Sequence, residues 1–243
     1  MIGFRELDKV LRNDPTPVKL VPLLRVGMLL AIGYGVCMGV FGLCGRAEPE
    51  YRQMIASAVK VPSLLLLTLI VTFPSLYVFN TLLGSKLRID ELARLLACAM
   101  GILVAVLAAF GPIVAFFSVT TISYPFILLL NVAFFGTAGA FGIAYLQRML
   151  NHLVEVDAER QAIDNITTDD EAGQLRVKPL ITSPTRSVFT VWMTVFVLVG
   201  SQMSWVLRPF VGSPTKEFTW FRERNSSFIE AVWRAIRQLS TEG

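Results

Sequence analysis

Long apolar stretches alternate with short polar stretches along most of this chain. Five apolar stretches, at about 23–45, 61–83, 92–117, 124–146 and 188–207, are long enough to cross a bilayer. A hydrocarbon core about 30 Å thick takes roughly 20 helical residues to cross. The stretches are continuously apolar rather than alternating, and lipid leaves no water to satisfy an open backbone, so each is predicted to be a helix.

Both ends of the chain show the helical spacing of an amphipathic segment. The apolar face of the first segment consists of Phe4, Leu7, Val10 and Leu11. That of the second consists of Phe228, Val232, Ile236 and Leu239. Ser227 and Glu230 form a capping box at the start of the second segment. We expect both helices to lie in the membrane interface, with packing on a neighbouring subunit as the alternative.

These patterns predict an all-α polytopic transmembrane helical bundle of about five spans. Residues 1–22 are expected to form a cytoplasmic amphipathic segment, and residues 208–243 an amphipathic tail. The transmembrane domain is expected at 23–207, with a cytoplasmic loop at about 147–187. The acidic centre of this loop lacks the spacing of a calcium loop and is expected to be a solvated charged segment.

The distribution of positive charge predicts the orientation. Thirteen lysines and arginines lie on one side: eleven precede the first span or lie in the loops after the second and fourth spans, and Arg25 and Arg94 lie in the first turns of the first and third spans. Three lie on the opposite side. Because cytoplasmic loops carry the excess of positive charge, the N-terminus is expected in the cytoplasm. Five spans would then place the tail outside, although the tail carries six basic residues.

Composition agrees with a membrane protein and limits the chemistry. The chain is 54% apolar and 16% charged, with a mean hydropathy of +0.60. It has one histidine and three cysteines, none in a metal-ligand spacing. No known catalytic motif is present, and the central parts of the predicted spans contain no ionisable residue. The sequence therefore predicts a protein that is not an enzyme and has no metal, cofactor or nucleic-acid partner.

Small residues recur every four positions in three of the predicted spans, and such residues let helices approach closely in lipid. The packing residues predicted on this basis are Gly27, Ala31, Gly35, Gly39, Ala97, Gly101, Ala105, Gly136 and Ala140. The pattern leaves open whether the contacts form within one chain or between chains. Because these faces outnumber what five helices readily bury, a homo-oligomer is expected.

Neutral polar residues within the spans are candidates for helix-to-helix hydrogen bonds or for a pore lining. They are Thr72, Ser75, Asn80, Asn131 and Gln202. Asn131 and Gln202 lie at similar predicted depth, so an amide hydrogen bond between them is one expectation. Pro74 and Pro112 lie inside spans and are expected to kink them, because proline removes a backbone donor.

Two segments, GSQMSWVLRPFVGSP at 200–214 and FPSLYVFNTLLG at 73–84, resemble segments of uncharacterised bacterial multi-pass membrane proteins. The resemblance implies a bacterial inner-membrane location and no particular activity. Physically, the first segment reads as the exit of a span, where Trp205 and Arg208 would anchor to lipid headgroups.

Two functions remain open from the sequence. The first is a non-enzymatic scaffold or accessory subunit that assembles with itself or with a membrane partner. The alternative is an ion channel or uncoupled pore or transporter lined by the kinked second span. In either case the lipid bilayer is the expected environment.

Overall fold

The computed structural model describes residues 2–12, 18–44, 51–82, 89–168, 184–212, 218–221 and 227–242. Within these ranges the chain forms seven α-helices and no strand. The helices are α1 (Ile2–Leu11), α2 (Leu20–Cys44), α3 (Tyr51–Leu82), α4 (Ile89–Thr120), α5 (Tyr124–Thr168), α6 (Pro184–Val206) and α7 (Phe228–Glu242). The expected all-helical class is therefore confirmed for the described residues.

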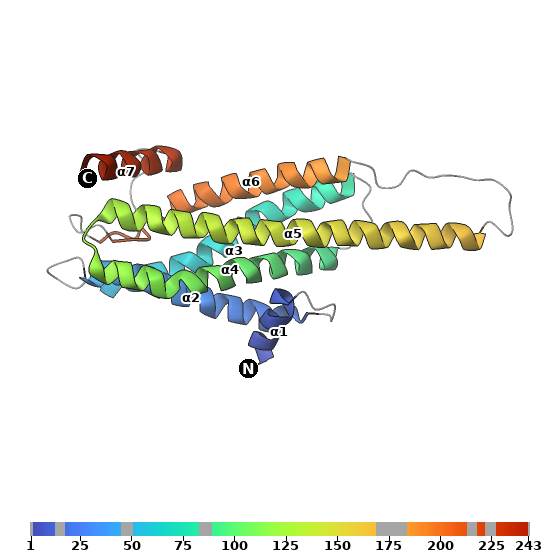
Figure 1. Ribbon diagram of the computed structural model, residues 1–243, viewed down its shortest axis with the longest axis horizontal. Coiled ribbons are helices and arrows are strands. Elements are labelled where there is room, and N and C mark those ends of the chain that lie inside the picture. The colour runs from blue at the N-terminus through green and yellow to red at the C-terminus, as the bar shows by residue number, and fades with distance from the viewer. Residues whose placement is uncertain are drawn as a thin grey trace.

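The long helices run side by side in an elongated bundle (Figure 1). α2 packs against both α3 and α4, α4 packs against α5, and α6 packs against α3. α5 is the longest helix and extends well past the ends of its neighbours (Figure 1). Short α1 lies across α2 at one end of the bundle, and α7 lies beside the first turns of α5 at the other end.

Four helical segments in the described ranges are long and apolar enough to cross a membrane: Leu20–Cys44, Tyr51–Ser75, Ala93–Thr120 and Tyr124–Met149. They correspond to the first four predicted spans. In α6 the described apolar part, Val191–Val206, is shorter than a full span. A multi-pass membrane protein is therefore supported, and a fifth crossing by α6 stays a prediction.

The second span begins earlier than the sequence indicated. It was expected at 61–83, whereas α3 begins at Tyr51 and ends at Leu82. The first turns of α3 contain three polar residues, Gln53, Ser57 and Lys60, which lower the local hydropathy although the helix continues through them. They lie three and four positions apart, so they share one face, and that face is buried inside the protein.

The main core fills the space between α2, α3, α4 and α5. Its most deeply buried large side chains include Tyr34, Phe41, Leu107 and Ile127. Close contact between α2 and α3 depends on glycine. A Cβ atom added at Gly35 would lie 2.5 Å from the Ser57 carbonyl oxygen, and one added at Gly39 would lie 2.5 Å from the Met54 Cα. Neither position has room for a larger residue unless the backbones separate.

The amphipathic helix α1 packs on the bundle through half of its predicted apolar face. Leu7 and Val10 are buried with Leu23 of α2 and Ile102 of α4, which are part of the same cluster. The rest of the predicted face is exposed, at Phe4 and Leu11.

The amphipathic helix α7 packs against α5 of its own chain. Ala235 is buried, and Ile229 and Trp233 are exposed. An interfacial position in a membrane stays a prediction for both end helices.

Candidate functional site

The most polar buried site of the described chain lies where the residues after α6 fold back onto α3. We call residues 207–212 the strap. Beyond Leu207, whose N–H donates to the Met203 carbonyl of α6 at 3.0 Å, the strap is not helical, yet Phe210 and Val211 belong to the main core. Irregular backbone at membrane depth is tolerated only where protein surrounds it and satisfies its polar groups. The strap thus needs donors from a neighbouring element.

Three side chains on one face of α3 supply these donors. Gln53 Nε2 donates to the Phe210 carbonyl at 3.0 Å, and Ser57 Oγ donates to the same carbonyl. Lys60 Nζ donates to the Pro209 carbonyl at 2.9 Å. All three side chains are at most 3% exposed. The spacing of Gln53, Ser57 and Lys60 along α3 therefore brings all three side chains to two consecutive carbonyls of the strap, those of Pro209 and Phe210.

Lys60 also binds the next described part of the tail. Its ammonium donates to the Trp220 carbonyl and lies 5.4 Å from the centre of the Phe221 ring. A buried lysine in a membrane protein is costly unless hydrogen bonds replace its hydration. From the sequence, Lys60 is one of the three basic residues on the outer side and lies at the end of the second predicted span, where its side chain could extend to water. Instead, it connects α3 to two separate segments of the tail.

The predicted headgroup anchors are Trp205, in the last turn of α6, and Arg208, the second residue of the strap. The Arg208 guanidinium lies 3.7 Å from the centre of the Trp205 ring, which is a cation–π contact. The next peptide bond, between Arg208 and Pro209, is cis. Both side chains are partly buried and partly accessible, and each contacts the other.

A second buried polar pair joins α2 to α5. The Tyr34 hydroxyl donates to Asn131 Oδ1 at 2.9 Å, and Asn131 Nδ2 donates to the Ile127 carbonyl at 2.8 Å. Tyr34 is 1% and Asn131 3% exposed. The partner of Asn131 is thus Tyr34 rather than Gln202, which is exposed on α6.

The polar face of the second predicted span is covered by α6. The Thr72 hydroxyl donates to the Thr68 carbonyl at 2.7 Å, and Thr72 is 1% exposed. The Thr72 carbonyl accepts hydrogen bonds from the Ser75 hydroxyl at 2.7 Å and from Trp192 Nε1 at 3.2 Å. In this arrangement the hydroxyls of Thr72 and Ser75 are bound to the backbone of α3. The side chain of Asn80 lies outside the described residues.

Proline occurs inside both helices where the sequence placed it. α3 continues through Pro74, which is exposed, and also through Pro62, which is buried. α4 continues through Pro112, which is exposed. The expected kinks stay predictions.

The predicted small-residue positions differ in their surroundings. Within the bundle, Ala31, Gly35, Gly39, Ala97 and Gly101 are buried, and Ala105 is partly buried. Gly27 and Gly136 face open space: a Cβ atom added at either would meet nothing within 4 Å. Ala140, one turn after Gly136, is exposed. The α5 ladder, at Gly136 and Ala140, thus makes no close contact with the described part of the chain.

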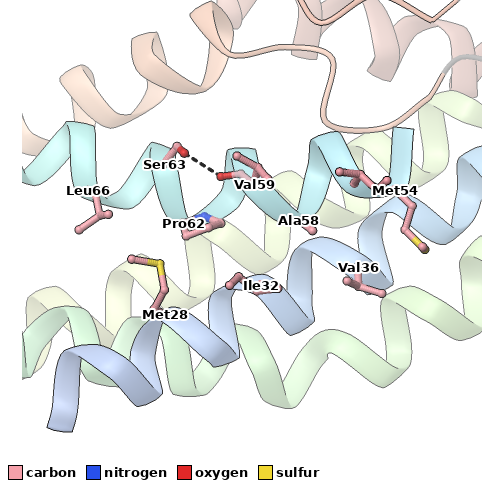
Figure 2. Close-up of a pocket in the computed structure, with 10 residues that line it drawn as sticks. Met28, Ile32, Val36, Met54, Ala58, Val59, Pro62, Ser63 and Leu66 are labelled. Atoms are coloured by element: carbon pink, nitrogen blue, oxygen red, sulfur yellow. Dashed lines mark hydrogen bonds between the residues drawn. The ribbon is translucent and has the colours of Figure 1, made fainter. Parts of the chain in front are cut away.

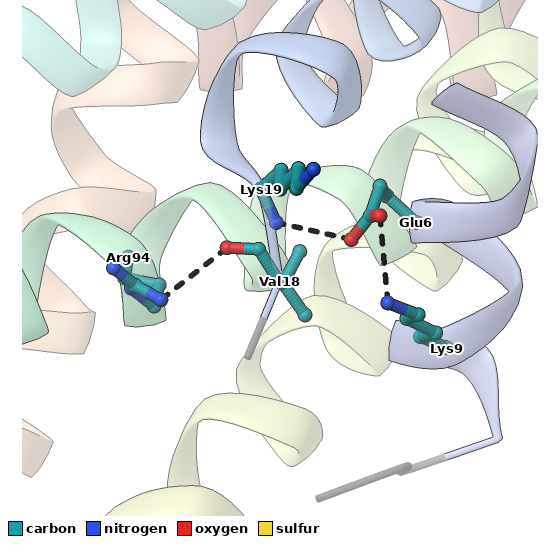
Figure 3. A network of polar contacts seen from close by, with 5 residues as sticks. All are labelled: Glu6, Lys9, Val18, Lys19 and Arg94. Carbon is teal, nitrogen blue, oxygen red and sulfur yellow. Dashed lines mark hydrogen bonds and ion pairs between the residues drawn. The ribbon is translucent and has the colours of Figure 1, made fainter. Parts of the chain in front are cut away.

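A polar network joins Val18 and Lys19, immediately before α2, to α1 and α4 (Figure 3). The Glu6 carboxylate accepts a hydrogen bond from the Lys19 backbone N–H at 3.0 Å and forms an ion pair with the Lys9 ammonium at 3.4 Å. Arg94 of α4 donates to the Val18 carbonyl at 3.3 Å. The hydrogen bond from Lys19, together with the nearby Lys9 ammonium, lowers the pKa of the Glu6 carboxyl.

The described residues hold no group of three or more histidine, cysteine, aspartate or glutamate side chains that could bind a metal ion. Comparisons of the chain with family models, with curated proteins and with solved structures find no match. A proposal for its function therefore rests on the arrangement of its own residues.

Of the residues that build the strap site, the sequence interpretation missed Gln53 and Ser57 and placed Lys60 at the end of a span. One signal could have found them. Three polar residues at positions i, i+4 and i+7, immediately before an apolar run, are typical of one buried polar face on a helix that has already begun.

Proposed function

We propose that the protein is a non-enzymatic integral membrane scaffold or accessory subunit that assembles through the exposed small-residue face of α5. The supporting observation is the position of Ala133, Gly136, Thr137 and Ala140, all exposed on the same side of this helix. They follow the three- and four-residue spacing of one helix face. Small residues at that spacing let a second helix approach closely in lipid.

The chain itself supplies a comparison for this face. Where α2 meets α3, glycines four residues apart allow backbone contact, at Gly35 and Gly39. The α5 face has the same spacing and no bulky side chain at its centre. The Thr137 hydroxyl donates to the Ala133 carbonyl at 2.8 Å, so it leaves no unsatisfied donor on the surface. Such a face suits a second transmembrane helix, from another copy or from a different protein.

The proposed location is a bacterial inner membrane, with the N-terminus in the cytoplasm and α6 as the fifth crossing. The excess of lysine and arginine before α2 and in the loops after α3 and α5 supports this orientation. α6 runs alongside α3 and leads to the end of the bundle where α7 lies, opposite to α1 (Figure 1). In this topology the strap and α7 lie on the outer side.

The channel or pore remains a weaker proposal. A pore lined by the second span would use Thr72 and Ser75, whose hydroxyls are bound to backbone carbonyls beside Trp192. Conductance in planar bilayers tests it directly. A reproducible current that changes in Thr72→Val would support the pore over the scaffold.

Mass photometry of the purified protein in nanodiscs tests the scaffold. We expect an oligomer from the native chain and a shift toward monomer in Gly136→Leu. The matched control is Gly33→Leu, because Gly33 of α2 is also exposed with nothing within 4 Å of an added Cβ. A native chain that is monomeric in nanodiscs, both alone and in extracts of its source membrane, would contradict the proposal. An oligomer insensitive to Gly136→Leu would remove α5 from the interface.

A further inference from the structure

An apolar groove of about 400 Å³ lies on the outside of the bundle between α2 and α3. Its α2 wall is formed by Met28, Ile32 and Val36, and its α3 wall runs from Met54 to Leu66. In Figure 2 the two walls face each other across the groove. Ser63 is the one hydroxyl in the lining, and it donates to the Val59 carbonyl at 2.7 Å. Apart from this hydroxyl, the side chains that line the groove are apolar.

The groove has the shape of a site for one acyl chain. From Met54 to Leu66 the helix rises about 18 Å, at 1.5 Å per residue. The walls carry bulky, partly exposed side chains, including Ile32, Ile55 and Val59, which are 38%, 54% and 52% exposed. Bulky side chains keep a neighbouring helix at a distance, because close helix packing in lipid needs small residues. A flexible hydrocarbon chain can follow such walls, and methionine adapts its shape to it.

α2 and α3 diverge toward the end of α2 that carries Arg25. α2 and α3 touch at Gly35 and Gly39, but a Cβ atom added at Gly27 would meet nothing within 4 Å. Figure 1 shows the same divergence of the two helices. Arg25 precedes Met28, Ile32 and Val36 by three, seven and eleven residues, so it lies on the same side of α2. It is exposed and has no hydrogen-bond or ion-pair partner among the described residues.

We propose that this groove binds one anionic phospholipid, with an acyl chain between α2 and α3 and the phosphate at Arg25. A guanidinium at the membrane surface attracts anionic headgroups and can pair with phosphate through two parallel hydrogen bonds. α1 crosses α2 at this level, since a Cβ atom added at Gly3 would lie 2.7 Å from the Pro22 carbonyl oxygen. An amphipathic helix at that depth is typical of the headgroup region. The site lies on helices other than α5 and does not depend on the proposed assembly.

Native mass spectrometry of the detergent-purified protein tests the site, with dioleoylphosphatidylglycerol and dioleoylphosphatidylcholine as probes. We expect one phosphatidylglycerol to be retained about fivefold more than phosphatidylcholine, the preference for one basic residue near a membrane surface. Arg25→Gln should remove this preference. Ile32→Trp fills the groove and should lower retention of both lipids, and Val59→Trp does so from the opposite wall.

Arg52→Gln is the matched control, because Arg52 is exposed at the other end of the groove, three residues before Ile55. It should leave the preference unchanged. Equal retention of the two lipids by the native protein, or a preference that survives Arg25→Gln, would overturn the proposal. An effect of Arg52→Gln in place of Arg25→Gln would also overturn it. A lipid-free dimer that Ile32→Trp converts to monomer would assign the groove to a second copy. Lipid retention is compared only between variants that are as monodisperse as the native protein and have the same melting temperature.

Discussion

The carbonyl of Phe210 allows a direct test of how the strap is held. It accepts two hydrogen bonds, from Gln53 Nε2 at 3.0 Å and from Ser57 Oγ. Ser57→Ala or Gln53→Met removes one donor and leaves the other, and each keeps most of the packing volume. We expect each substitution to lower the free energy of unfolding by about 1 kcal/mol, the usual net value of one buried hydrogen bond.

The double substitution should cost more than the sum of its parts. With both donors removed, the buried Phe210 carbonyl loses its partners on α3. An unsatisfied buried carbonyl costs roughly 1–3 kcal/mol. The double variant should therefore be less stable than additivity predicts by about 1–2 kcal/mol, a coupling of the size seen for residues that share one partner.

Reversible unfolding in mixed micelles of increasing denaturing detergent measures these free energies. Ser63→Ala is the matched control, because the Ser63 hydroxyl is exposed and donates to Val59 of its own helix. We expect it to change stability by less than about 0.5 kcal/mol, as surface substitutions usually do. An additive double variant, or a control as costly as Ser57→Ala, would refute the shared-carbonyl explanation.

Three further predictions concern other parts of the bundle. Tyr34→Phe leaves Asn131 Oδ1 without its 2.9 Å donor and should lower the free energy of unfolding by roughly 1–3 kcal/mol in the same assay. Gly39→Leu should separate α2 from α3, because its Cβ would lie 2.5 Å from a backbone atom. We expect a loss of at least about 3 kcal/mol, whereas Gly33→Leu should be nearly neutral. Folding lowers the pKa of the Glu6 carboxyl, so ionised Glu6 stabilises the folded state at pH values above the ordinary pKa of 4.5. This stabilisation is lost as the pH falls from 4.5 through the lowered pKa. Proteolysis between α1 and α2 should accelerate at acid pH in the native protein and show no such acceleration in Glu6→Gln.

The sequence predicted the helices well where their apolar runs are long and unbroken. It failed at the start of α3, because hydropathy averages over all faces of a helix. Gln53, Ser57 and Lys60 lower that average although they face inward. Their partners are carbonyls more than 140 positions away in the chain, at Pro209 and Phe210. Such a pairing depends on tertiary structure and leaves no local pattern in the sequence.

Small-residue spacing predicted where helices can approach but could not assign the partners. The same four-residue spacing is buried at Gly35 and Gly39 of α2 and exposed at Gly136 and Ala140 of α5. Likewise, the sequence singled out Asn131 as a buried amide. It could not identify Tyr34 as the partner, since an aromatic residue in an apolar run carries no sign that its hydroxyl is needed.

The topology of the ends tests the account most directly, because it depends on α6 crossing the membrane and on the strap lying on the outer side. Single cysteines replace Arg5 of α1 and Ser240 of α7, both exposed, in a chain whose three native cysteines are changed to serine or alanine. A membrane-impermeant maleimide is then added to intact cells and to inverted vesicles. We predict labelling at 240 in intact cells alone and labelling at 5 in inverted vesicles alone. Labelling of both positions from the same side would contradict the five-span arrangement.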